Sequence, residues 1–126
     1  MDRKVLVVDD EDHIRMLIEQ TLEDLEDEGV ELLFANNGED ALNLIKAEKP
    51  ELVLLDVMMP RMNGMDVCRH VKSDQNLKET HIIILTAKGQ EMDKQKGVEV
   101  GANQYMTKPF DPDELLETVE GILQLS

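Results

Sequence analysis

The fold is decided by the stretch LVLLD, residues 52–56, a continuous apolar run that ends in a carboxylate. Two similar runs occupy residues 5–8, followed by Asp9 and Asp10, and residues 82–85, followed by Thr86. Continuous runs of this length, rich in leucine and β-branched residues, are typical of strands buried on both faces of a parallel sheet. With weaker candidates at 31–35 and 104–107, the sequence predicts five strands.

Segments with helical spacing of apolar residues alternate with these runs. Their apolar stripes are Ile14, Leu17, Ile18, Leu22 and Leu25; Ala41, Leu42 and Ile45; Gly64, Val67, Cys68 and Val71; and Leu115, Leu116, Val119, Ile122 and Leu123. Asp111-Pro112 before the last stripe is typical of a helix N-cap followed by proline at the first helical position. Residues 90–100 form the poorest helix, because polar residues stand at its inward positions, and we expect it to be loosely held.

Five β–α repeats imply right-handed crossovers and an α/β fold. We expect a doubly wound, five-stranded parallel sheet of flavodoxin-like type, in the order 2-1-3-4-5, with five helices on its two faces. A length of 126 residues fits one domain, spanning residues 1–126.

The chain is strongly acidic, with 28 acidic against 13 basic residues and a formal net charge of −15. This charge repels nucleic acid and anionic lipid, so neither is an expected partner. The single cysteine, Cys68, cannot form an internal disulfide and is expected in the core. No apolar stretch is long enough for a signal peptide or membrane span, and we expect a cytoplasmic protein. His13, His70 and His81 are too scattered to hold a metal and are expected at the surface.

The chemistry collects at the ends of the strands. Asp9, Asp10 and Asp56 follow the first and third runs, Thr86 follows the fourth, and Lys108 follows the fifth. Carboxyl ends of parallel strands meet at one edge, where ligands bind near the switch point. One lysine cannot balance the negative charge of three crowded carboxylates. A divalent cation can, and the carboxylate oxygens suit Mg²⁺. A carboxylate, a lysine, a hydroxyl and Mg²⁺ at one edge favour phosphoryl transfer.

Each of these residues alone has a plainer interpretation. Asp9 and Asp10 could simply favour the positive end of the next helix, and Thr86 could be a helix cap. Asp56 and the Lys108-Pro109 pair could be turn residues, and Tyr105 could be core. Their coincidence at one sheet edge is what favours a phosphoryl site.

Taken together, the motifs resemble the bacterial response-regulator receiver domain of two-component systems, over essentially the whole chain. The resemblance is carried by VLVVDD (5–10), LLDVMMP (54–60), NG (63–64), ILTA (84–87) and GANQYMTKPF (101–110). It implies phosphorelay signalling, in which a histidine kinase or phosphotransfer protein phosphorylates the domain and a downstream effector protein or domain responds. A phosphorylation-dependent dimer is left open.

The resemblance implies roles for the acids. Asp56 resembles the phosphoacceptor. Asp9 and Asp10 resemble the acidic pair that holds Mg²⁺ together with Asp56, Asp10 usually directly and Asp9 often through water. The backbone carbonyl of Met58 resembles the remaining protein ligand.

The resemblance also implies a switch. The Thr86 hydroxyl and the Ala87 amide would meet the phosphate, and Lys108 would bind it. Pro109 resembles the proline that follows a cis peptide bond in this family. Tyr105 resembles the aromatic switch that turns inward on activation, which would change the surface formed by the fourth helix, the fifth strand and the fifth helix.

Three other functions fit the sequence less well. A phosphatase of the haloacid-dehalogenase type would use Asp56 as its nucleophile but needs a carboxylate where Met58 stands. A nucleotide- or flavin-binding domain needs a glycine-rich loop after its first strand. This chain has acids at residues 9–11 instead, which would repel phosphate. A receiver kept only as an interaction module would not need a complete site. We therefore expect a switch that catalyses only its own phosphorylation and dephosphorylation.

Overall fold

A computed structural model describes residues 3–87, 101–108 and 110–124 of the chain. Its five strands form one parallel sheet in the order β2-β1-β3-β4-β5. They are β1 (Arg3–Val8), β2 (Val30–Ala35), β3 (Leu52–Asp56), β4 (His81–Ala87) and β5 (Gln104–Lys108). The predicted fold class and strand order are confirmed.

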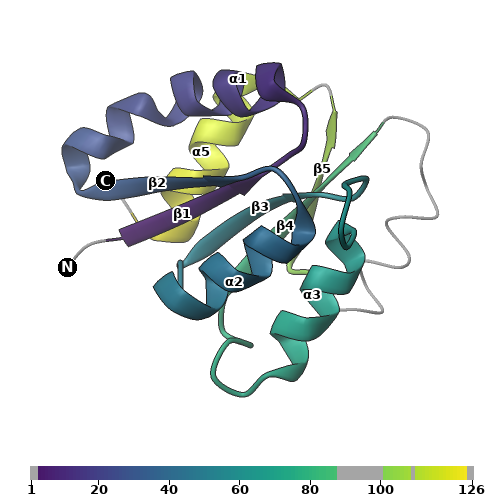
Figure 1. Cartoon of the computed structure of the whole chain (residues 1–126). Helices are drawn as coiled ribbons and strands as arrows, with labels where there is room; N and C mark the ends of the chain where they lie inside the picture. Colours follow the sequence, from purple (N-terminus) through teal and green to yellow (C-terminus); the bar gives the residue numbers. More distant parts are fainter. Residues whose placement is uncertain (1–2, 88–100, 109, 125–126) are drawn as a thin grey trace.

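Helices cover both faces of the sheet, α2 and α3 on one side and α1 and α5 on the other (Figure 1). Their bounds are α1 (Asp12–Leu22), α2 (Gly38–Glu48), α3 (Gly64–Ser73) and α5 (Pro112–Leu123), and a 3₁₀ helix η1 (Glu23–Glu28) extends α1. Asp111 caps α5 as predicted, accepting a hydrogen bond from the Asp113 amide at 2.9 Å. The fifth predicted helix (90–100) and Pro109 lie outside the described residues.

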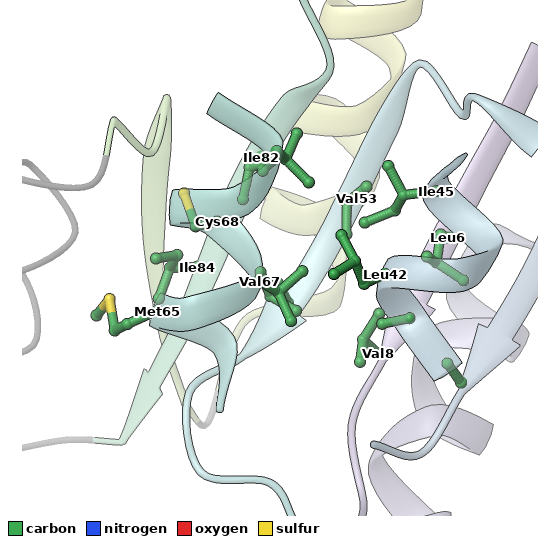
Figure 2. Close-up of a cluster of buried hydrophobic side chains, with 14 of the residues drawn as sticks. Leu6, Val8, Leu42, Ile45, Val53, Met65, Val67, Cys68, Ile82 and Ile84 are labelled. Carbon is green, nitrogen blue, oxygen red and sulfur yellow. The ribbon is translucent and has the colours of Figure 1, made fainter. Parts of the chain in front are cut away.

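The strands are sandwiched between two apolar cores because their side chains alternate between the faces. In β1, Leu6 and Val8 pack with α2 and α3, whereas Val5 and Val7 pack with α1 and α5. Figure 2 shows the first of these cores, with Cys68 among its buried residues. The residues of β1, β3 and β4 in these cores are fully buried, which explains why their sequences are continuously apolar.

The prediction that the three histidines lie at the surface has a mixed outcome. His13 and His70 are exposed as predicted, but His81 is half-buried and its Nε2 is buried, so the surface prediction is wrong for it. The reason is that β4 begins at His81, whose backbone amide donates to the Glu51 carbonyl at 3.1 Å. Among the described residues, no helix is long and apolar enough to cross a membrane.

Candidate functional site

The carboxyl ends of β1 and β3 bring three acids together. Asp9 directly follows β1 and Asp56 ends β3, and the parallel register pairs Val8 with Leu55, so the two acids lie at the same level. Asp9 and Asp56 are buried, whereas Asp10 is exposed. One oxygen from each of the three carboxylates lies within 4.8 Å of the others. The predicted convergence of Asp9, Asp10 and Asp56 is thus observed.

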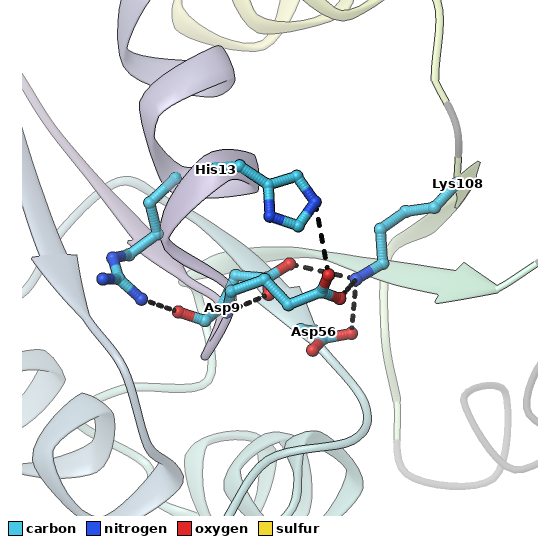
Figure 3. A network of polar contacts seen from close by, with 6 residues as sticks. Asp9, His13, Asp56 and Lys108 are labelled. Atoms are coloured by element: carbon cyan, nitrogen blue, oxygen red, sulfur yellow. Dashed lines mark hydrogen bonds and ion pairs between the residues drawn. The ribbon is translucent and has the colours of Figure 1, made fainter.

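Lys108, the last residue of β5, joins the two buried acids (Figure 3). Its Nζ lies 3.0 Å from Asp9 Oδ2 and 3.0 Å from Asp56 Oδ1. Because β4 separates β5 from β3, the long lysine side chain has to reach across the sheet edge to make both contacts. The structure therefore brings Lys108 to the carboxylates, as the sequence predicted.

The segment after Asp56 turns back tightly toward the end of β3. The Gly64 amide donates to the Val57 carbonyl at 2.9 Å, and Asn63 caps α3 by accepting from the Asp66 amide at 3.0 Å. A Cβ at position 64 would lie 2.1 Å from the Asp56 carbonyl oxygen, so only glycine fits there. The NG pair in the sequence thus starts α3 directly against the backbone of Asp56.

The burial of Asp56 makes its negative charge unfavourable. Burial, followed by repulsion from Asp9, raises the pKa of Asp56 to about 6, and Asp10 adds to the rise while Lys108 opposes it. Burial alone would lower the pKa of Lys108, but hydrogen bonds to Asp56 and Asp9 outweigh it and the pKa is raised. The lysine is therefore charged and only partly compensates the three carboxylates.

The raised pKa of Asp56 predicts how the stability of the metal-free protein depends on pH. Between the ordinary value of 3.8 and about 6, the folded state binds more protons than the unfolded state. The free energy of unfolding therefore falls as the pH rises through the folded-state pKa. Asp56 alone lowers it by about 1 kcal/mol between about pH 5 and pH 7. Urea unfolding of the wild type and Asp56→Asn at both pH values isolates the effect. A difference between the two proteins that does not change with pH would contradict the raised pKa.

The three carboxylates fit a small divalent cation. They provide oxygen ligands alone, of the kind that Mg²⁺ prefers, and their mutual repulsion is relieved by positive charge. Exposed Asp10 leaves one side of the group open to water, which suits an ion that retains several water ligands. Met58 lies two residues beyond Asp56 and is 66% exposed.

Thr86, Ala87 and Tyr105 occupy β4 and β5 beside the acids. Asp56 pairs with Leu85, so Thr86 lies one step further toward the same edge, where it is buried. The backbone of Ala87 pairs with Lys108. Tyr105 is half-buried and packs against the core beneath α2 and α3. Thr86 and Ala87 thus lie at the sheet edge that carries the acids, whereas Tyr105 lies deeper in the sheet.

Two charged residues at the site were not predicted from the sequence. Glu11 Oε1 lies 3.8 Å from Lys108 Nζ, and its other oxygen lies 3.3 Å from His13 Nε2. Arg15 donates to the Asp9 carbonyl at 2.5 Å and also pairs with Asp12. The available signal was Arg15 four residues after Glu11, since residues at this helical spacing share a face.

Comparisons with known proteins agree with this geometry. The family described as response regulator receiver domain matches residues 5–120. The alkaline phosphatase synthesis transcriptional regulatory protein PhoP of Bacillus subtilis is 43% identical over 126 residues, covering 100% of this chain and 50% of that protein. The chain thus spans half the length of this curated relative.

Solved structures show the same fold. The chemotaxis response regulator CheY4 of Vibrio cholerae superposes with a TM-score of 0.85 at 34% identity, over 97% of this chain and 99% of that one. The BeF3-activated DrrB receiver domain gives a TM-score of 0.85 at 36% identity, over 98% and 99% of the two chains. Sequence, fold and site geometry therefore agree across almost the whole chain.

Proposed function

This chain belongs to the response regulator receiver domain family, and we propose that Asp56 is its phosphoacceptor. Receiver domains of two-component response regulators serve phosphorelay signalling, as phosphoacceptor switches and not as classical enzymes. The observation that carries the proposal is the buried Asp56 carboxylate, which shares Lys108 with Asp9 at 3.0 Å on each side. A nucleophilic carboxylate beside a fixed cation is what an incoming phosphoryl group requires.

The chemistry is a single displacement on phosphorus. An oxygen of Asp56 forms a P–O bond while the P–N bond to a phosphohistidine of a histidine kinase or phosphotransfer protein breaks. The histidine nitrogen keeps the electron pair and takes up a proton. Lys108 then pairs with the phosphoryl oxygens, and later attack by water on phosphorus returns free Asp56. The domain thereby catalyses only its own phosphorylation and dephosphorylation.

Asp9, Asp10 and Asp56 would hold Mg²⁺ together with the backbone carbonyl of Met58. The three carboxylates support this assignment because their oxygens lie within 4.8 Å of one another, and Lys108 pairs with Asp9 and Asp56. When bound, Mg²⁺ supplies positive charge that neutralises both the carboxylates and the phosphoryl oxygens. Asp10, the exposed member, offers the most accessible ligand.

The phosphorylated carboxylate carries about −1.5 to −2 charge and therefore attracts nearby donors. We assign the Thr86 hydroxyl and the Ala87 amide to this role, because both residues end β4 beside Asp56. Movement of Thr86 makes room for Tyr105 to turn inward. The surface that the resemblance assigns to the predicted fourth helix, β5 and α5 then changes shape, which is a shift between two pre-existing states.

A downstream effector protein or domain reads that surface, and a dimer that forms on phosphorylation is one form this output can take. The receiver unit extends over residues 1–126, and its net charge of −15 favours protein partners over nucleic acid or anionic membrane. Cytoplasmic location stays a prediction.

Incubation with acetyl phosphate tests the proposal without a kinase. We expect intact-mass spectrometry to show addition of one phosphoryl group in millimolar Mg²⁺ and little addition in excess chelator, because the site needs a cation. Asp24→Asn is the matched control for Asp56→Asn, since Asp24 is an exposed acid on η1, and it should label like the wild type. Equal labelling of the wild type with and without Mg²⁺ would contradict the proposed metal role.

A further inference from the structure

Gly38, the first residue of α2, touches the tip of the β3–α3 loop (residues 57–63). A Cβ at position 38 would lie 1.9 Å from the Met62 carbonyl oxygen and 2.7 Å from its carbonyl carbon. The obstructing atoms belong to the backbone, so no side-chain rotation relieves the clash. The Gly38 amide also points to the Pro60 carbonyl, at a long 3.4 Å. The loop tip therefore rests on α2 only because position 38 has no side chain.

The tip of this loop has a backbone conformation that needs support. Arg61 has a φ of 59° and Met62 a φ of 116°, two successive non-glycine residues in the region that favours glycine. Such residues keep this conformation only where surrounding contacts impose it. The base of the loop is closed by the Gly64 amide on the Val57 carbonyl at 2.9 Å. Contact with Gly38 is a second restraint, acting at the opposite end of the loop.

The surface that supports the tip is itself fixed to the acidic site. Asn37 is buried, caps α2 through the Asp40 amide at 2.8 Å, and donates to Asn36 Oδ1 at 2.9 Å. Just before this turn, the Ala35 carbonyl accepts a hydrogen bond from the Asp9 amide at 3.2 Å. One short stretch, residues 35–38, therefore holds both the backbone of Asp9 and the tip of the β3–α3 loop.

An open cleft joins these parts to the exposed carboxylate. It has a volume of about 360 Å³ and is lined by Asp10, Asn36, Asn37, Pro60 and Arg61. Its lining thus comes from the loop, from the turn before α2 and from Asp10. The loop tip therefore forms part of the cleft wall, and the same loop carries Met58, two residues after Asp56.

We infer that Gly38 is a positioning residue for Mg²⁺: it lets α2 fix the loop that carries the Met58 carbonyl. This inference rests on the proposed function, because it assigns Gly38 a part in the same metal site. Gly38 itself touches neither the metal ligands nor the phosphoryl group, and it acts only through the loop.

The test is Gly38→Ala, with Mg²⁺ affinity measured by calorimetric titration of the unphosphorylated protein. We expect the Kd for Mg²⁺ to rise about tenfold, the range seen when residues that orient metal ligands are changed. Gly121→Ala is the matched control, because a Cβ at position 121 of α5 meets nothing within 4 Å. Its Kd should equal that of the wild type.

A second readout separates positioning from a general loss of stability. In Gly38→Ala, labelling by acetyl phosphate should be slow at low Mg²⁺ and should recover toward the wild-type rate at saturating Mg²⁺. A general packing defect would lower the melting temperature without changing the Kd. If Gly38→Ala is partly unfolded, all titrations are repeated in trimethylamine N-oxide, which favours the folded state.

The outcomes distinguish this inference from the proposed function. Suppose that the wild type binds Mg²⁺ and is labelled, and that folded Gly38→Ala has the same Kd for Mg²⁺ as the wild type. This result overturns the role of Gly38 alone. Failure of the wild type itself to bind Mg²⁺ or to be labelled overturns the proposed function. If the Kd for Mg²⁺ rises as much in Gly121→Ala as in Gly38→Ala, the inference is also overturned, because the effect would not depend on the loop.

Discussion

Asp56→Asn is expected to abolish phosphoryl labelling and, in the same protein, to raise the stability of the metal-free fold. Labelling disappears because an amide is no nucleophile toward phosphorus. Stability rises because the wild-type carboxylate is buried beside Asp9, which raises its pKa to about 6, and the neutral amide avoids that repulsion. The pKa shift corresponds to about 2–3 kcal/mol at neutral pH. Intact-mass spectrometry and urea unfolding measure the two effects.

The control for this prediction is the metal dependence of stability. Bound Mg²⁺ stabilises the wild type by binding only its folded state. In Asp56→Asn this stabilisation should be smaller, because one charged ligand is lost. Full labelling of the variant would contradict the assignment of Asp56, and a loss of stability without metal would contradict the crowding of its carboxylate.

Lys108→Met is expected to have the second largest effect. Lys108 is the one described cation within 4.0 Å of the carboxylates of Asp9 and Asp56, and all three side chains are largely buried. Removing one partner of a buried ion pair destabilises a protein by about 3 kcal/mol or more, because charges are left unpaired. Labelling should also fall by about 100-fold, the usual effect of losing one donor to developing negative charge. Urea unfolding and the labelling rate provide the two measurements.

Two comparisons make the Lys108 prediction specific. Arg69→Met removes an exposed pair with Asp66 on α3 and should change the free energy of unfolding by less than about 0.5 kcal/mol. Mg²⁺ should restore much of the stability lost in Lys108→Met, because it supplies the missing positive charge. A Lys108→Met protein as stable as Arg69→Met in the absence of metal would contradict the buried network.

The sheet could be predicted from the sequence because burial on both faces leaves an unmistakable pattern. The runs at 5–8, 52–55 and 82–85 have no polar residue, and they became three adjacent central strands. Given the strand order, the parallel register places Asp9 beside Asp56 whatever the side-chain conformations are. The convergence of the acids is therefore a consequence of topology, and short-range patterns were sufficient to find it.

Other features could not be predicted because they depend on how side chains and loops meet in space. The approach of Glu11 to Lys108 joins residues at opposite ends of the chain, and no spacing rule connects them. The contact between Gly38 and Met62 depends on a loop conformation with positive φ angles at non-glycine residues. His81 was wrongly expected at the surface because its half-burial depends on the point at which β4 begins.

The decisive experiment is to locate the phosphoryl group after reaction with acetyl phosphate and Mg²⁺. Borohydride reduces an acyl phosphate on aspartate to homoserine, so peptide mass spectrometry identifies the residue that carried it. We predict conversion at position 56 alone, dependent on Mg²⁺, with Asp9 and Asp10 unmodified. Conversion at Asp9, Asp10 or another acid, or no conversion in a folded wild-type protein, would contradict the assignment of Asp56 as the phosphoacceptor.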